Sequence, residues 1–278
     1  MTTQIKRRTM LAGIGLAGIG ALGAGVMGSG HAAEGQSAGV SQAKRSWRDM
    51  VRMQMSTAPG DVVWWYTGRI YAQVGEQSPQ HLYNLEGTEI YWVRELDDGS
   101  FSVSSRTLTF FRDKLTGEMI REYVNPFTGK TNQVSANRLG GKDTNNFTAA
   151  GWTSTYGSDP ARQREPWQID WHRSGDLEWL TSSRFTKRPP QPLMESATVF
   201  CSTDALSNPE IHSLPSHFTS SYLSPWQRWM EMGDQEGHLL WHSSGRKLNS
   251  LDEIPAEYRQ RVDSEYGGVL TASPDSWG

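Results

Sequence analysis

The sequence predicts a mainly β protein whose strands form a single antiparallel β-barrel, with an N-terminal strap and a C-terminal helix beside it. Three observations support this fold class. Apolar and polar residues alternate along several segments, short turns rich in Gly, Asn, Asp and Pro separate the segments, and few helical patterns intervene. Strands joined by short turns form an antiparallel meander, which has to close or be covered to hide its edges. A β-sandwich is the alternative.

Residues 1–32 form a predicted export signal that is cleaved after Ala32. A basic start is followed by the apolar, glycine-rich stretch Met10–Met27. Arg7 and Arg8 match the pair of a twin-arginine signal. The sequence therefore predicts the twin-arginine export machinery as a partner, a periplasmic or secreted location, and no stable membrane insertion after cleavage. A Sec signal or a retained anchor is the alternative.

Residues 33–60 are predicted to be a linker followed by a short helix. Ser46 is placed to cap a helix that runs to Met55, with Trp47 and Met50 on one stripe. We expect this segment to be a strap that flanks or plugs the main domain.

A single β-rich domain is predicted over residues 61–270. Its clearest strand is Asp61–Val74, in which Trp64 and Tyr66 share one face. The other predicted strands cover residues 82–95, 100–112, 118–124, 131–138, 167–172, 177–184, 195–202, 217–223 and 237–243. Leu251–Val262 has the spacing of a C-terminal helix. These elements predict a barrel with a calycin-like cavity.

Leu139–Glu165 interrupts the strand pattern, because it shows no periodicity and is rich in Gly, Asn, Thr and Ser. A connection of this length is usually functional or disordered. Since Trp152 and Tyr156 lie within it, we expect it to pack as a lid.

The chain is rich in tryptophan, with 12 among 278 residues. Such side chains line cavities for flat or apolar ligands, although they also fill barrel cores, and both interpretations stay open. The aromatic pattern predicts a small hydrophobic or aromatic molecule as a partner. The candidate ligand-binding residues are Trp64, Tyr66, Trp92, Trp179, His217, Trp226 and Trp229.

Charge and motifs argue against several functions. The net charge is −3 and the mature part has no basic cluster, so nucleic acid is not an expected partner. The single cysteine, Cys201, allows no internal disulfide. His238 and His242 would lie about 13 Å apart on a strand, too far to share a metal. Because Gly-rich phosphate loops and the Gly-x-Ser-x-Gly and His-Glu-x-x-His motifs are also absent, we expect no metal and no other cofactor.

Candidate catalytic residues are Glu86, Arg106, Asp170 and His172. Asp170 and His172 alternate on one predicted strand, where the carboxylate could orient the imidazole for acid–base chemistry; a solvent-facing polar pair is the alternative. Glu86 lies among apolar residues, so its pKa would be raised unless Arg94 or Arg106 pairs with it. It is therefore either a general base or half of a structural ion pair between strands.

Several motifs together point to a family. They are Leu85-Glu-Gly87, Phe110-Phe-Arg-Asp-Lys-Leu-Thr-Gly117, Val124-Asn-Pro-Phe-Thr-Gly129, Pro225-Trp-Gln-Arg-Trp-Met-Glu-Met-Gly233, His242-Ser-Ser-Gly-Arg-Lys-Leu248 and Leu251-Asp-Glu-Ile-Pro255. Over roughly residues 45–270 the chain resembles the bacterial family filed under domain of unknown function 1838, whose members often begin with a twin-arginine signal. The resemblance implies no reaction and assigns no catalytic residue.

Two functions from different classes follow from these observations. The first is a cofactor-independent enzyme, a lyase, isomerase or hydrolase, that acts on a small aromatic or isoprenoid compound. The second is a non-catalytic periplasmic carrier of a hydrophobic small molecule. An enzyme requires at least two of the candidate polar side chains to converge on one point in the cavity.

Overall fold

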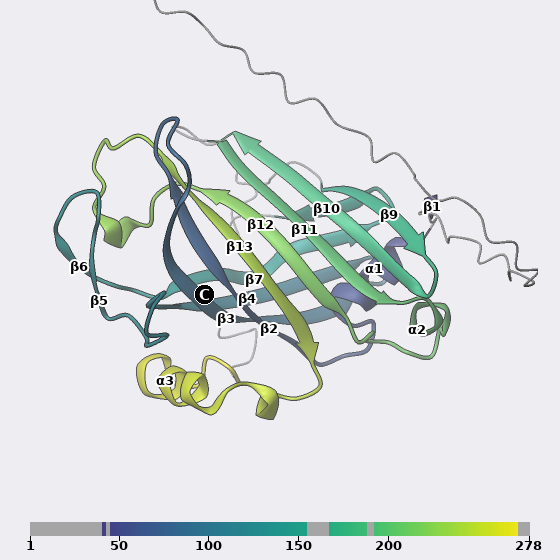
Figure 1. Ribbon diagram of the computed structural model, residues 1–278. Helices are drawn as coiled ribbons and strands as arrows, with labels where there is room; N and C mark the ends of the chain where they lie inside the picture. The colour runs from purple at the N-terminus through teal and green to yellow at the C-terminus, as the bar shows by residue number, and fades with distance from the viewer. Residues whose placement is uncertain (1–40, 43–44, 155–166, 188–191, 272–278) are drawn as a thin grey trace, which may run out of the picture. The chain divides into compact units, whose positions relative to one another are not determined.

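The fold is described from a computed structural model (Figure 1). The structure describes residues 41–42, 45–154, 167–187 and 192–271. The predicted export signal and most of the linker after it lie outside these residues. No helix in the described ranges is long and apolar enough to cross a membrane.

The described residues form one antiparallel sheet of eleven strands, in the order β1-β9-β10-β11-β12-β13-β2-β3-β4-β7-β8. Its first eight strands in chain order are β1 (Ser41–Gln42), β2 (Asp61–Gln73), β3 (Gln80–Glu95), β4 (Phe101–Arg112), β7 (Asn137–Thr148), β8 (Gly151–Ser154), β9 (Gln168–Ser174) and β10 (Leu177–Lys187). The last three are β11 (Pro192–Ser202), β12 (His217–Ser224) and β13 (His238–Leu248). A separate pair consists of β5 (Glu122–Val124) and β6 (Thr131–Gln133).

The sheet curls into a half-barrel that does not close (Figure 1). The mainly β, antiparallel class is therefore confirmed, whereas the predicted closure is wrong: the described strands show no ladder between β8 and β1 or β9. A β-sandwich would need two facing sheets, and ten strands longer than two residues here belong to a single sheet.

The predicted lid is also corrected by the structure. Residues 139–148 belong to β7 and residues 151–154 to β8, and the two strands extend the sheet beyond β4. The sequence of β7 is mostly polar, so it shows no alternation of apolar and polar residues. Its ladder with β4 also shifts register between Val103 and Ser105. Gly140 lies opposite Arg106 with a φ of 105°, where a Cβ atom would be 2.0 Å from the carbonyl oxygen of Ser105. The rest of the predicted lid, including Tyr156, lies outside the described residues.

Helix α1 (Trp47–Gln54) forms the predicted strap helix. Ser46 caps its N-terminus in a capping box with Asp49. Met50 and Met53 are at most 1% exposed and pack with Leu180 of β10 inside the half-barrel. Each such buried side chain contributes about 2 kcal/mol to folding, which holds α1 across one end of the interior.

Helix α3 (Ala256–Tyr266) confirms the predicted C-terminal helix and covers the outer face of β2, β3 and β4 (Figure 1). Its Tyr258 is fully buried and donates a hydrogen bond of 2.7 Å to the carbonyl oxygen of Leu108. The remaining short elements are α2 (Thr203–Ser207), η2 (Arg228–Met230) and η3 (Leu251–Glu253). Segment η2 and the β5–β6 pair pack over the end of the interior opposite α1.

Candidate functional site

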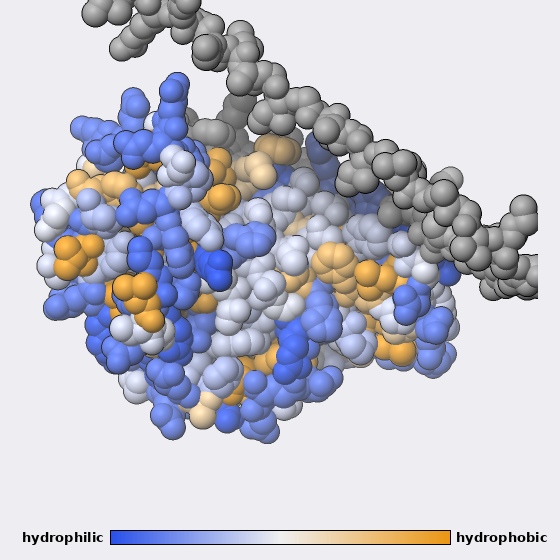
Figure 2. Space-filling model, viewed as in Figure 1, coloured by the Kyte–Doolittle hydropathy of each residue, from blue (hydrophilic) through white to orange (hydrophobic). Residues whose placement is uncertain are grey.

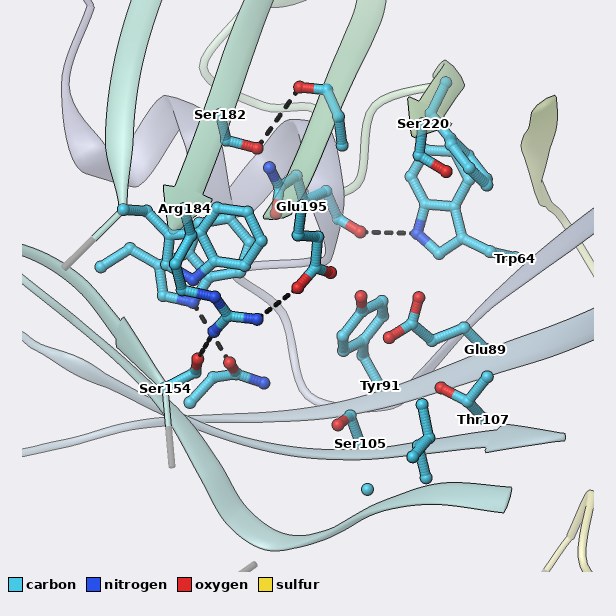
Figure 3. Close-up of a pocket in the computed structure, with 18 of the residues that line it drawn as sticks. Trp64, Glu89, Tyr91, Ser105, Thr107, Ser154, Ser182, Arg184, Glu195 and Ser220 are labelled. Atoms are coloured by element: carbon cyan, nitrogen blue, oxygen red, sulfur yellow. Dashed lines mark hydrogen bonds and ion pairs between the residues drawn. The ribbon is translucent and has the colours of Figure 1, made fainter. Parts of the chain in front are cut away.

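A cavity of about 410 Å³ lies inside the half-barrel, between α1 and the curled strands (Figure 3). Its walls come from β2, β3 and β4 on one side, from β10, β11 and β12 on the other, and from β7 and β8 at the open edge. The aromatic part of the lining consists of Trp64, Tyr91, Trp152, Trp167 and Phe218. A second hollow, of about 460 Å³, lies on the outer face of β13, β2 and β3.

Glu89 is the carboxylic acid of the β3 wall. It lies directly across from Trp64 of β2 and Thr107 of β4, so the alternation of the strands turns it into the cavity. The pKa of Glu89 is raised to about 7, chiefly by burial and in smaller part by the charge of Glu195, while hydrogen bonds with the hydroxyls of Tyr91 and Thr107 partly oppose the shift. Glu89 forms no ion pair within the described residues. Its proton is therefore exchangeable near neutral pH.

Tyr91 follows two residues later and shares the same face of β3. Burial and the neighbouring carboxylate of Glu89 raise the pKa of this phenol well above its ordinary value. The Tyr91 hydroxyl therefore stays protonated and can donate a hydrogen bond into the cavity. Figure 3 shows the phenol and the Glu89 carboxyl side by side.

An ion pair between Arg184 of β10 and Glu195 of β11 forms the facing wall. The Arg184 side chain is 2% exposed and also donates to the Ser154 hydroxyl of β8. The Glu195 side chain keeps 31% exposure and borders the cavity. The Arg184 guanidinium thus binds the Glu195 carboxylate from one side, and the Glu195 side chain also borders the cavity.

Stacked aromatic rings lie between the end of β8 and the start of β9, where the half-barrel is open. The rings of Trp152 and Trp167 lie 4.1 Å apart at 10°, and Arg184 lies 4.2 Å from the centre of the Trp167 ring. One backbone hydrogen bond of 3.0 Å joins the Trp167 nitrogen to the Trp152 oxygen. The buried Nε1 of Trp167 has no hydrogen-bond partner within the part of the chain that the structure describes.

Helix α1 forms the floor of the cavity. The Trp64 indole donates a 2.7 Å hydrogen bond to the Gln54 carbonyl, and Gln54 itself lines the cavity. The buried side-chain nitrogen of Lys247 donates to the carbonyl oxygens of Arg52, at 3.0 Å, and Met55, at 2.8 Å. Burial lowers the pKa of Lys247 well below its ordinary value, and the two hydrogen bonds anchor this side chain at the C-terminal end of α1.

The model of a family described as a protein of unknown function, DUF1838, matches residues 60–276. The chain belongs to the DUF1838 family. No match was found among curated proteins or among solved structures. The matched range contains Glu89, Tyr91, Arg184 and Glu195, whereas α1 precedes it.

Glu86, a predicted catalytic residue in the DUF1838 range, lies on the opposite face of β3 from Glu89. It is 6% exposed and pairs with Arg112 at 2.6 Å, and Arg112 also contacts Glu257 of α3 at 3.0 Å. The partner is therefore Arg112 rather than Arg94 or Arg106. This geometry matches the structural ion pair between strands that the sequence left open.

The other three predicted catalytic residues also lie outside the cavity. Arg106 donates a 2.9 Å hydrogen bond to the Val269 carbonyl after α3. Asp170 is exposed, and the ring of His172 stacks on Trp179 with centroids 5.5 Å apart. The structure does not bring the four predicted residues together, because strand alternation turns all of them away from the interior.

Among the predicted ligand-binding residues, only Trp64 borders the cavity. Tyr66 also faces the interior, where its hydroxyl is 2.7 Å from that of Thr109. Trp226 and Trp229 pack at the β5–β6 end of the molecule. Trp92, Trp179 and His217 lie on outer or solvent-facing surfaces, with Trp92 37% exposed and His217 exposed.

Sequence reasoning missed Glu89, Tyr91, Arg184 and Glu195. A signal for Glu89 existed: pairing the two predicted strands through the turn between them places it across from Trp64, on the face of the candidate ligand-binding residues Trp64 and Tyr66. No comparable signal marked Arg184 or Glu195, since their pairing depends on the register of β10 with β11.

Proposed function

We propose that this protein is a cofactor-independent enzyme, a lyase, isomerase or hydrolase, that binds a small aromatic or isoprenoid compound in the half-barrel cavity. The observation that carries the proposal is Glu89, a carboxylic acid with a pKa of about 7 inside an aromatic-lined cavity. A general acid or base is most effective when its pKa is close to the working pH. A carrier needs no such group.

The cavity has the size and chemistry that this ligand class requires. Its volume of about 410 Å³ lies within the usual range for small-molecule sites. Trp64 and Phe218 meet edge to face at 5.3 Å and offer apolar surface. The hydroxyls of Thr107, Ser182 and Ser220 add neutral polar groups that can orient a ligand.

We also propose that the twin-arginine machinery exports the protein to the periplasm or the medium, on the basis of Arg7 and Arg8. Replacing both by lysine should leave the full-length protein in the cytoplasm, as measured by cell fractionation. Lys6→Arg is the matched control and should leave export unchanged. Export of the twin-lysine variant at the wild-type level would contradict this assignment.

Ligand binding and turnover can be tested separately. Saturation-transfer difference NMR with 2-naphthol and geraniol as probes should show binding by the wild type. Mass spectrometry of a panel of aromatic and isoprenoid alcohols, esters and ketones should show conversion of at least one. Glu89→Gln should retain binding but lose conversion, whereas Asp170→Asn, the same chemical change on the outer surface, should retain both.

Three outcomes would count against this proposal or against the role of Glu89 in it. Binding without conversion by the wild type would indicate the carrier instead. Binding of neither probe would contradict a cavity for aromatic or isoprenoid ligands. Equal conversion by the wild type and Glu89→Gln would exclude Glu89 as the proton-transferring group.

A further inference from the structure

Two carboxyl groups of the described residues line the cavity, in different electrostatic surroundings. Glu195 is charge-balanced by Arg184, which is itself almost fully buried. Glu89 has no cationic partner within the described residues and instead lies beside the Tyr91 hydroxyl. Two titratable groups kept in contrasting environments often divide the roles of acid and base.

The three groups face a common space. Tyr91 and Glu89 project from one face of β3, and Glu195 projects from β11 on the opposite wall. Figure 3 shows the Glu195 carboxylate pointing toward the space that Tyr91 and Glu89 border. A small molecule in this space would have a carboxylate on one side and two O–H groups on the other.

We infer that the cavity catalyses proton transfer at a carbon atom next to a carbonyl group, with Glu195 as the base and with Tyr91 and Glu89 as donors to the carbonyl oxygen. The substrate class is a small ketone or conjugated enone that carries an aromatic or isoprenoid skeleton. This inference rests on the proposed function, and it selects an isomerase or lyase among the three reaction classes.

The proposed step needs no further reactant. Glu195 takes the proton from the α carbon, the C–H electron pair forms a C=C bond, and the carbonyl π electrons move onto oxygen. The oxygen of the resulting enolate accepts hydrogen bonds from Tyr91 and Glu89. Return of the proton from Glu195 to the same carbon regenerates the substrate, and return to a conjugated carbon gives the isomer.

The protonation states suit these roles. Donors placed where negative charge develops stabilise the transition state most when they are already positioned and shielded from water. Burial keeps Tyr91 protonated, and Glu89 holds its proton up to a pH of about 7. The Arg184 guanidinium pairs with the Glu195 carboxylate, which lies on the cavity wall opposite the two donors.

Deuterium exchange tests the inference directly. The full chain is incubated in D₂O with 2-tetralone, and ¹H NMR follows loss of the α-proton signal. The wild type should accelerate exchange at least about tenfold over a protein-free sample, a conservative share of what acid–base catalysis provides. Glu195→Gln should return exchange to the background rate, and Asp170→Asn should exchange as the wild type does.

A binding measurement shows whether the variants keep the site. 2-Naphthol imitates the planar enol, and naphthalene is the probe without a hydroxyl. Wild type and Glu195→Gln should both prefer 2-naphthol, whereas Tyr91→Phe should lose about tenfold in that preference, which is the value of one buried hydrogen bond. If Glu195→Gln does not fold, Glu195→Asp is the second variant, because it keeps a carboxylate that can pair with Arg184. Its side chain is one methylene shorter, so the carboxylate lies farther from the substrate and exchange should still slow at least about tenfold.

The outcomes separate the inference from the proposed function. Absence of exchange by a wild type that binds 2-naphthol, or equal exchange by Glu195→Gln, would overturn the inference. If another compound were then converted in a Glu89-dependent way, the proposed function would stand. If Glu89→Gln changed no conversion of any compound, the proposed function would fail as well.

Discussion

Glu86 and Glu89 lie three residues apart on β3 and experience opposite environments. Glu86 faces outward, where Arg112 holds it at 2.6 Å beneath α3. Glu89 faces inward, where no cation pairs with it within the described residues and its pKa rises to about 7. The comparison shows that burial alone does not mark a reactive carboxyl. A buried carboxyl is marked as reactive when it also lacks a counter-charge and borders a cavity.

The largest expected difference between these two residues is in catalysis. Glu89→Gln should lower kcat/KM by about 10²-fold or more, because loss of a general acid–base group usually costs that much. Glu86→Gln should keep kcat/KM within about threefold of the wild type once folded protein is compared. Steady-state kinetics on the compound identified by the conversion screen measures both. A larger loss in Glu86→Gln than in Glu89→Gln would reverse the assignment.

A second difference should appear in the pH dependence of stability. Glu89 has a folded-state pKa of about 7 against an ordinary value of 4.5, so the folded protein holds this proton more tightly than the unfolded chain does. Its contribution is fully present below pH 4.5 and is lost as the pH rises through 7, which lowers the free energy of unfolding by at most about 3 kcal/mol. Glu89→Gln should therefore be more stable than the wild type at pH 8 and similar to it at pH 4.5.

Chemical denaturation of both proteins across this pH range measures the difference. The groups that act on Glu89, namely Tyr91, Thr107 and Glu195, and the lining cations Arg138 and Arg184 are unchanged in Glu89→Gln, so their direct contributions largely cancel. Parallel stability curves for the two proteins between pH 4.5 and 8 would show that the pKa of Glu89 is not raised.

Glu86 should matter more for stability than for chemistry. Glu86→Gln should lower the free energy of unfolding by about 2 kcal/mol at pH 7, less than for a fully buried pair, because Arg112 keeps Glu257 as a partner. Urea unfolding measures this change, and Glu257→Gln is the exposed comparison, expected to cost below about 1 kcal/mol. Equal costs for the two variants would show that burial adds nothing to this ion pair.

The smallest effects should come from the outer face. Asp170→Asn and His172→Gln should each change stability by less than about 0.5 kcal/mol and leave conversion unchanged, because Asp170 is exposed and His172 only stacks on Trp179. Loss of conversion in either variant would point to a site on the outer surface and away from the cavity.

Local patterns in the sequence predicted much of the fold. Alternation along β2, the Ser46 cap of α1 and the apolar spacing of α3 all correspond to elements of the structure. Each of these signals is contained within one segment, so no knowledge of partners is needed. The open edge and the strand character of residues 139–154 were not predictable, because they depend on pairing between distant and polar segments.

The site was harder to predict for the same reason. Whether Glu86 or Glu89 faces the interior depends on register, since a shift of one residue turns a strand over. The pair of Arg184 and Glu195 appears only when β10 and β11 are aligned. Composition correctly indicated an aromatic-rich protein, but it could not separate cavity walls such as Trp64 from exposed residues such as Trp92.

The contact of Lys247 with α1 has a consequence for the order of folding. Its side-chain nitrogen donates a hydrogen bond to the Arg52 carbonyl across 195 residues of sequence, so the helix that is synthesised early lacks this anchor until almost the whole chain exists. Contacts between distant segments form late, because closing a long loop costs entropy before the contact repays it. The floor of the cavity therefore cannot be completed before β13 has been synthesised, and the same holds for the pairing of β13 with β2.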